Sequence, residues 1–132
     1  MYSMDEIMDM LDWNNPPEVQ EKGRELCKKI RCINVFLQPV HPGHSKNVWD
    51  NCAMILADRA DSELMPYLDR LFEWLMDMNW PGAECIYDRL KQYKDREWFN
   101  AVLNNCINEA KCLQEEIWLS VLQEFKAPCE QT

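Results

Sequence analysis

Hydrophobic residues recur at intervals of three and four positions along the whole chain, which is the spacing of one face of an α-helix. The pattern is most regular at Leu64, Leu68, Leu71, Leu75 and Met78. We therefore expect an all-α fold of about seven helices. The segments that carry such a stripe lie at approximately residues 3–12, 16–31, 46–59, 61–78, 81–90, 95–110 and 114–126.

Capping residues support several of these helix boundaries. Asn15 is a good N-cap, and it precedes Pro16, which suits a first helical position because proline lacks the N–H that would be unsatisfied there. Ser45 and Asp95 are predicted to cap the third and sixth helices. Pro66 lies close enough to the start of the fourth segment to be tolerated in its first turn. The fourth segment is therefore interpreted as one helix.

The longest connection is formed by residues 32–44. We interpret residues 34–39 as an extended, partly buried strap and residues 41–44, His-Pro-Gly-His, as a turn. The other connections are two to five residues long, which makes consecutive helices antiparallel neighbours. Because no low-complexity linker divides the chain, residues 1–132 are expected to form a single domain with a frayed tail at 126–132.

One short pattern occurs twice. Asp12 to Pro16 and Asp77 to Pro81 both read Asp-x-Asn-x-Pro, 65 residues apart, although the apolar stripes that follow align better at an offset of 64. The echo indicates that the same helical-hairpin plan is used twice, as in proteins built from stacked helical pairs. Together with the short connections, it predicts antiparallel pairs stacked in a short HEAT-like solenoid.

The charge and hydropathy of the chain narrow its expected partners. The net charge is −9, so binding of nucleic acid through a broad basic face is not expected. No stretch approaches the roughly 20 apolar residues that cross a bilayer. The acidic N-terminus lacks the features of a signal peptide, which favours a cytoplasmic location. An acidic surface is either simply solvated or matched to a basic protein partner.

The seven cysteines are odd in number and lack an accompanying export signal, which argues against a disulfide framework. Cys27, Cys52 and Cys106 fall on the apolar stripes of predicted helices. We expect them to be reduced, buried thiols that behave as small hydrophobic side chains.

The turn Asp77-Met78-Asn79-Trp80-Pro81-Gly82 is the most distinctive local feature. Asp77 and Asn79 can bind free backbone N–H groups at the helix junction, and Trp80 can pack there as a staple. The alternative is that Trp80, and Trp13 in the echoing turn, are exposed aromatic anchors for a partner. The remaining tryptophans, Trp49, Trp74, Trp98 and Trp118, lie on apolar stripes and are expected in the core.

An acidic stripe follows the fourth segment. Asp69, Glu73 and Asp77 are spaced four residues apart and therefore lie on one side of a helix. Such a stripe is either a solvated face or a surface for a basic partner. The candidate partner-binding residues are Trp80, Asp77, Asn79, Glu73, Asp69 and Trp13.

No catalytic motif is present. The chain lacks a GxSxG motif, a Walker loop and a GxGxxG motif, and its three glycines cannot build a phosphate cradle. We therefore expect neither an enzyme nor a cofactor. The alternative is a metal-dependent hydrolase that uses His41, His44 and Asp50, although an HxxH pair in a loop lacks the fixed geometry of a helical HExxH motif.

Residues 45–53 and 71–82, which include Trp-Leu-Met-Asp-Met-Asn-Trp-Pro-Gly, resemble a family of small bacterial proteins known only as a domain of unknown function. The similarity extends over roughly residues 12–95. It implies a bacterial source and a HEAT-like, all-helical fold, and it brings no activity, cofactor or catalytic residue.

The leading functional hypothesis is a protein-protein binding module. One concrete version is an immunity-type or adaptor protein that covers a basic partner. The alternatives are the metal-dependent hydrolase and a purely structural subunit that buries an apolar patch in a symmetric dimer. The pattern does not determine the oligomeric state.

Overall fold

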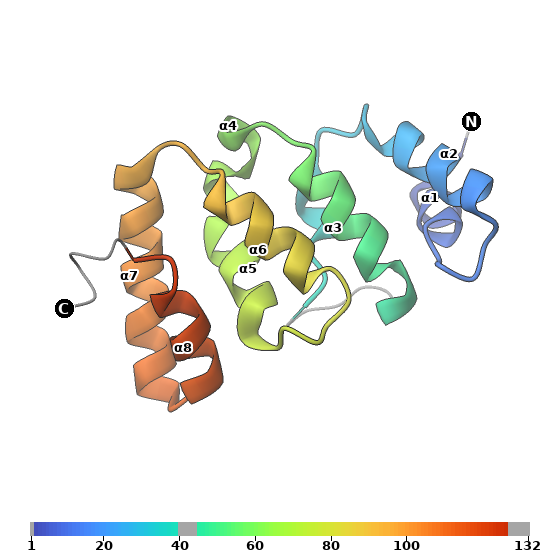
Figure 1. Cartoon of the computed structure of the whole chain (residues 1–132). Helices are drawn as coiled ribbons and strands as arrows, with labels where there is room; N and C mark the ends of the chain where they lie inside the picture. Colours follow the sequence, from blue (N-terminus) through green and yellow to red (C-terminus); the bar gives the residue numbers. More distant parts are fainter. Residues whose placement is uncertain (1, 40–44, 127–132) are drawn as a thin grey trace.

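Figure 1 shows the computed structural model, which describes residues 2–39 and 45–126. Over these ranges the regular elements are helices, without a strand. The α-helices are α1 (Met4–Met10), α2 (Pro17–Cys27), α3 (Trp49–Ala57), α4 (Asp61–Leu64), α5 (Leu68–Glu73), α6 (Ala83–Lys91), α7 (Arg96–Leu113) and α8 (Glu116–Gln123). The 3₁₀ turns are η1 (Ile33–Phe36), η2 (Lys46–Val48), η3 (Met65–Tyr67) and η4 (Trp74–Met76). Because η2 continues into α3, and α4 to η4 are contiguous, the prediction of an all-α fold with about seven helices is confirmed.

The helix ends follow local hydrogen bonding. Asp95 caps α7 as predicted, since its carboxylate accepts from the N–H of Trp98 at 3.2 Å. Asn15 does not cap α2, because its side-chain amide donates to the backbone oxygen of Asp9 at 2.7 Å, and the helix begins at Pro17. The predicted cap was wrong because this side chain stabilises the turn between α1 and α2 instead.

Two other predicted boundaries differ from the structure. The side chain of Ser45 precedes η2 without making a capping hydrogen bond. Helix α2 ends at Cys27 rather than at residue 31. Its end leaves Lys28 and the following cations in the connection to η1.

The fourth predicted segment is a chain of short pieces rather than one helix. It runs α4, η3, α5, η4 and stops at Met76. Pro66 lies in η3, between the two α-helical pieces. A proline inside a helix removes a backbone donor and crowds the preceding turn, so the chain tightens into a 3₁₀ turn there. The expectation that this proline would be absorbed in the first turn was wrong.

The predicted strap between α2 and α3 is only partly as expected. Ile33, Phe36 and Leu37 are buried, as a partly buried strap requires. Residues 33–36 form the turn η1 instead of an extended segment, and η1 packs against α3. The predicted turn at 41–44 lies outside the described residues.

Helices α2, α3 and α6 lie side by side and run in the same direction (Figure 1). At their C-terminal ends, Arg59 donates to the backbone oxygen of Cys27, and Arg89 donates to the backbone oxygens of Ala57 and Arg59. Near their N-terminal ends, Asn51 of α3 donates to Gln20 of α2 at 3.0 Å. Each helix is thereby held to its neighbour at both ends.

The row continues from α1 and α2 at one end to α7 and α8 at the other (Figure 1). Helix α5 packs between α6 and α7, and α8 packs on α7 and η4. Between the parallel helices α2 and α3 the chain forms only the short η1, which packs on α3. A regular stack of helical pairs would have a full helix at that place.

Aromatic side chains fill the core between the later helices. The rings of Phe72, Phe99 and Phe125 lie 5.3 to 5.8 Å apart, and the buried Trp118 donates from Nε1 to the backbone oxygen of Phe72 at 2.9 Å. Trp49, Trp74 and Trp118 are buried as predicted. Trp98 was wrongly assigned to the core, because it lies in the first turn of α7 and is 39% exposed.

Candidate functional site

The two Asp-x-Asn-x-Pro sequences form the same turn. In one, the Asp77 carboxylate accepts from the N–H of Asn79 at 2.9 Å, and its carbonyl accepts from the N–H of Trp80 at 3.0 Å. In the other, Asp12 makes the equivalent bonds with residues 14 and 15, at 2.8 and 3.0 Å. Asp77 thus stabilises the helix junction as expected. The side chain of Asn79 is exposed.

The second turn seats α6 against α3. Gly82 has a φ of +85°, and a Cβ atom at this position would lie 2.6 Å from Cβ of Ala53. The ring of Trp80 packs edge-on against Trp49, with centroids 5.7 Å apart, and Trp80 is half-buried. Trp74 donates from Nε1 to the backbone oxygen of Pro81 at 2.9 Å. These contacts favour the interpretation of Trp80 as a packing staple over that of an exposed anchor.

Trp13 differs from Trp80 although it sits in the matching turn. Its side chain is 44% exposed, while its backbone N–H donates to the oxygen of Asn47 at 3.0 Å. Both turns therefore contact the segment where η2 leads into α3. Of the two predicted anchors, Trp13 is the one whose ring is available at the surface.

The acidic stripe divides at the end of α5. Asp69 is exposed, whereas Glu73 lies 3.9 Å from Nε of Arg70 and its side chain is 19% exposed. Asp77 lies beyond η4, in the turn that packs on α3. The 3₁₀ turn η4 separates Asp77 from Asp69 and Glu73, so the three carboxylates do not follow one regular α-helical face.

Asp69 instead faces α7. A groove of about 360 Å³, here called the α5–α7 groove, separates η3 and α5 from α7. The exposed Trp98 lies in it and donates from Nε1 to the backbone oxygen of Met65 at 3.0 Å, a bond that holds the indole across the groove. The groove is lined by Met65, Pro66, Leu68, Asp69, Trp98, Val102, Asn105, Cys106 and Glu109.

The negative charge around this groove affects the pKa of the Cys106 thiol. Burial raises the pKa of Cys106, and the carboxylates of Glu109, Asp69 and Glu73 raise it further, to about 12. Burial and the negative groups of both α5 and α7 all disfavour the charged thiolate form of Cys106. Sequence reasoning included Asp69 and Glu73 but missed Trp98 and Glu109, whose spacing along the chain does not reveal that α7 packs against α5.

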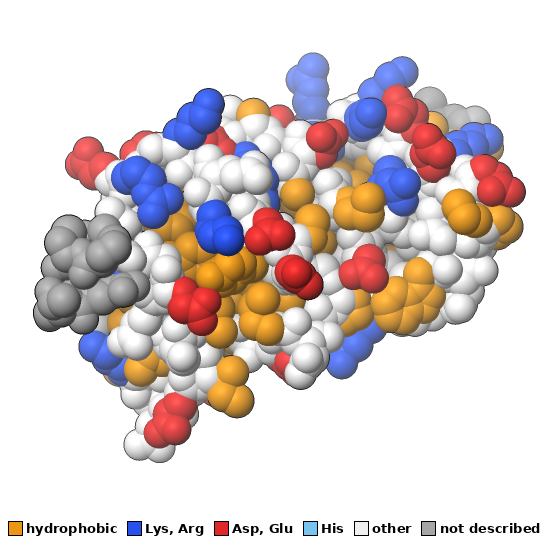
Figure 2. Space-filling model, in the orientation of Figure 1, with side chains coloured by type: hydrophobic (Ala, Val, Ile, Leu, Met, Phe, Trp, Pro, Cys, Tyr) orange, Lys and Arg blue, Asp and Glu red, His pale blue; other side chains and the backbone are white. Residues whose placement is uncertain are grey.

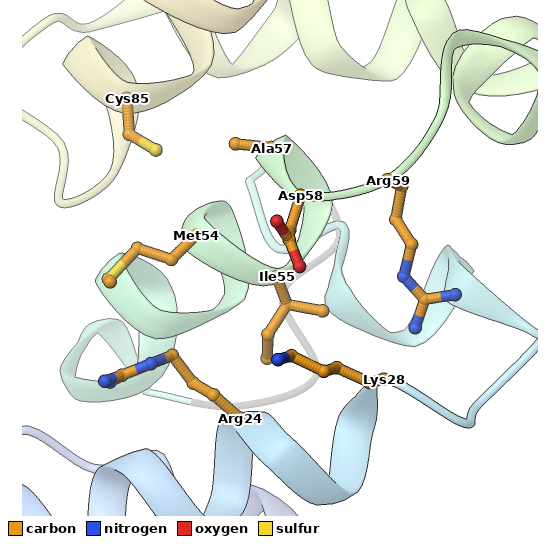
Figure 3. Close-up of a pocket in the computed structure, with 8 residues that line it drawn as sticks. All are labelled: Arg24, Lys28, Met54, Ile55, Ala57, Asp58, Arg59 and Cys85. Atoms are coloured by element: carbon orange, nitrogen blue, oxygen red, sulfur yellow. The ribbon is translucent and has the colours of Figure 1, made fainter.

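A second groove, here called the α2–α3–α6 groove, has a volume of about 370 Å³ (Figure 3). In Figure 3, Arg24 projects from α2 and Lys28 from the residue that directly follows this helix. Met54 and Ile55 project from α3, and Cys85 from α6 on the opposite side. Burial, together with Asp88 and Asp50, raises the pKa of the Cys85 thiol. The remaining lining residues are Ala57, Asp58 and Arg59.

Cations lie on one side of this second groove. Figure 2 shows Lys and Arg side chains, with Asp and Glu side chains among them, along the upper margin of the molecule, where α2, α3 and α6 end in Figure 1. An adjoining hollow of about 620 Å³ is lined by Lys28, Lys29, Ile30, Arg31, Asp58, Arg59 and Glu63. Positive side chains near a helix C-terminus oppose the negative end of its dipole, which accounts for their placement in the sequence.

The residues of the metal hypothesis are not brought together by any described contact. Asp50 is exposed in the first turn of α3, and His41 and His44 lie outside the described residues. Among the residues described, no three His, Cys, Asp or Glu side chains are grouped as metal ligands. The same part of the chain has no helix with the length and apolar character needed to span a bilayer.

Comparisons with known proteins bear on the central part of the chain. No curated protein and no solved structure gives a significant match. Residues 45–109 match the model of a family described as a domain of unknown function, DUF5071. The match begins at Ser45, ahead of η2, and ends within α7, so it includes the Trp80 turn and the α5–α7 groove but not α1 or α2. The predicted resemblance to a domain of unknown function is therefore confirmed over residues 45–109, which are similar to DUF5071.

Proposed function

We propose that this protein is a protein-binding module that takes a cationic segment of its partner in the α5–α7 groove. The observation that carries the proposal is an exposed tryptophan held across a groove whose two sides carry carboxylates. Trp98 is 39% exposed and is bonded to the backbone of Met65, while Asp69 and Glu109 lie on opposite sides. Tryptophan in a pocket is a frequent energetic centre of protein interfaces.

The chemistry of the groove selects a basic partner. Asp69 and Glu109 supply negative charge, and the chain as a whole carries a net charge of −9. The face of an indole attracts a Lys or Arg cation, and apolar side chains such as Met65 and Pro66 can cover the aliphatic stem of such a residue. An acidic protein also attracts a basic partner at long range and speeds encounter.

The proposal assigns binding rather than catalysis and includes an immunity-type or adaptor role, in which the protein covers a basic partner. A short HEAT-like stack suits that role because such stacks present grooves between successive helices. The cytoplasm suits the cysteines, since the six described thiols are free.

The proposal is tested with a fluorescein-labelled peptide of alternating lysine and leucine residues, followed by fluorescence anisotropy. We expect saturable binding that weakens about tenfold in Asp69→Lys and in Trp98→Ala, because each removes one attractive element of the groove. Glu21→Lys is the matched control. Its carboxylate is exposed on α2, so the variant has the same net charge as Asp69→Lys with an intact groove.

Equal loss of binding in Glu21→Lys and Asp69→Lys would mean that the peptide senses only the net charge, and the proposal would be wrong. Wild-type affinity in Trp98→Ala would equally refute it. Far-UV circular dichroism of each variant checks that the helices are intact.

A further inference from the structure

The α2–α3–α6 groove combines an apolar floor with a positive rim at the end of α2, in a chain whose net charge is −9. Carboxylates lie near its other side, because Asp58 lines the groove and Asp50 and Asp88 act on Cys85. Met54, Ile55, Ala57 and Cys85 supply the apolar part, and Met54 is 46% exposed although it is a large hydrophobic side chain. The charged lining consists of three cations and one carboxylate, which are Arg24, Lys28, Arg59 and Asp58. No residue of this groove was identified from the sequence as a candidate site.

The three cations differ in how far they are already used by the fold. Arg59 is only 10% exposed in its side chain and donates both to Glu63, at 3.0 Å, and to the backbone oxygen of Cys27. It therefore stabilises the junction between α2 and α3. Arg24 and Lys28 are the cations that a ligand can reach.

The guanidinium of Arg24 is held in place by a buried asparagine. Its Nη1 donates to Oδ1 of Asn51 at 2.6 Å, and Asn51 is only 3% exposed. The amide of Asn51 donates in turn to the backbone oxygen of Leu11 at 2.6 Å and to Gln20 at 3.0 Å. The other donors of the Arg24 guanidinium have no partner among the residues described. A fixed guanidinium with free donors loses little entropy when it binds a carboxylate.

Lys28, the second cation that a ligand can reach, is held less firmly than Arg24. Its side chain is 58% exposed and pairs with Glu25 at 3.0 Å across one helical turn. Surface pairs of this kind contribute little to stability, so the ammonium can exchange Glu25 for another carboxylate. Lys28 also lines the adjoining hollow with Lys29 and Arg31, which extends the positive rim past the end of α2.

From this arrangement we propose that the α2–α3–α6 groove binds an acidic, amphipathic segment of a protein partner. Leucine-like side chains of the segment pack on the exposed Met54, beside the buried Ile55, and its carboxylates meet Arg24 and Lys28. A nucleic acid offers no aliphatic side chains for the apolar floor. A net charge of −9 also repels an extended polyanion or an anionic membrane more strongly than it repels a short segment.

This site is independent of the proposed function, because it lies on other helices and takes the opposite charge. An experiment that refutes the acidic-segment site therefore does not refute the proposed function, and the reverse also holds. The two grooves together would let the protein hold a basic and an acidic segment at separate places on one row of helices.

The probe is a fluorescein-labelled 16-residue peptide with leucine at helical spacing and glutamate at the other positions, titrated with the full chain by fluorescence anisotropy. We expect binding that weakens about tenfold in Lys28→Glu, and similarly in Met54→Asp, which places a charge on the apolar floor. Both side chains are surface-exposed, so the fold should tolerate the changes.

Two matched variants accompany these. Lys22→Glu makes the same charge change on the same helix, but Lys22 donates to the hydroxyl of Tyr2 at 2.8 Å and lies outside the groove. Met65→Asp makes the same change at a methionine that is 44% exposed and lines the other groove. We expect both to bind the acidic peptide as the wild type does. Methyl resonances of labelled methionine give a direct readout, in which Met54 shifts on binding and Met65 does not.

Three results would overturn the proposal. The first is no binding of the acidic peptide by the wild type, and the second is equal binding by Lys28→Glu. The third is that anionic phospholipid vesicles or a single-stranded oligonucleotide bind the wild type more tightly than the peptide does, with loss of that binding in Lys28→Glu.

Discussion

At the scale of single residues, the packing of this protein depends on one glycine. Gly82 ends the turn that seats α6 on α3, and both its positive φ and its lack of a side chain are required. A Cβ atom there would lie 2.9 Å from the backbone oxygen of Trp49 and 3.1 Å from the ring of Trp74. A backbone oxygen, the Cβ atom of Ala53 and the packed indole of Trp74 cannot move aside easily, so the turn accepts no larger residue without a shift of α6.

Gly82→Ala should therefore lower the free energy of unfolding by more than about 1 kcal/mol, because strain at positive φ adds to the steric clash. Gly23→Ala is the comparison. Its Cβ atom would lie 3.0 Å from side-chain atoms of Leu11 and Met10, but alanine is favoured over glycine in a helix by about 1 kcal/mol, which offsets part of the crowding. Urea unfolding monitored by circular dichroism measures both. A loss at Gly23 as large as that at Gly82 would contradict this account.

At the scale of elements, buried arginines hold the ends of the parallel helices together. The sequence predicts cations at helix C-termini only as partners of the helix dipole. In the structure, Arg59 and Arg89 reach across to the last carbonyls of the preceding helix in the row. Arg89 also pairs with Asp61, which accepts a hydrogen bond from the N–H of Lys94 at 3.0 Å. These contacts join α3, α4 and α6 at one edge.

This junction is expected to make stability depend on acid pH. Burial raises the pKa of Asp61, but the hydrogen bonds from Lys94 and Arg89 outweigh it, and the pKa falls below its usual value. A lowered pKa stabilises the fold above the ordinary carboxyl pKa of about 3.9, and this stabilisation is lost as the pH falls through the folded-state pKa.

We predict that Asp61→Asn is less stable than the wild type by about 1–2 kcal/mol at neutral pH, and that the difference shrinks below about pH 4. Urea unfolding at a series of pH values measures the difference. Asp88→Asn is the control, because Asp88 forms an exposed pair with Lys91 at 3.8 Å. A difference in unfolding free energy between wild type and Asp61→Asn that stays constant down to pH 3 would exclude a contribution of Asp61 ionisation to stability.

At the scale of the whole molecule, one hydrophobic core runs through the row, and α8 covers its end. Trp118 is fully buried and Phe125 packs on Phe72 and Phe99. Trp118 is buried as predicted, whereas the neighbouring Ile117 is 72% exposed. The two neighbours lie on different faces because α8 presents only one side to α7 and η4.

The prediction of a single domain is tested by weakening the packing of α8 at the end of the row. Trp118→Ala should reduce the free energy of unfolding by about 3–5 kcal/mol, since it leaves a cavity and an unpaired carbonyl at Phe72. Trp13→Ala, at a side chain 44% exposed, should change it by less than about 1 kcal/mol. For one cooperative domain, tryptophan fluorescence and far-UV circular dichroism follow the same transition. Separate transitions would show that the two ends of the row unfold independently.

Periodicity along the chain determined that this protein is helical, where its longer helices lie, and most of its core, because the 3.6-residue repeat is a local property of the backbone. The repeated Asp-x-Asn-x-Pro turn was likewise visible, since a side chain bonds its own backbone two residues on. Only the tertiary structure showed that Trp98 faces a groove while Trp80 packs on Trp49. It also showed that Asp69 and Glu109 line the same groove and that Arg24 binds Asn51. Each of these depends on which helices pack together, and pairing between distant segments leaves no mark in the spacing of either one.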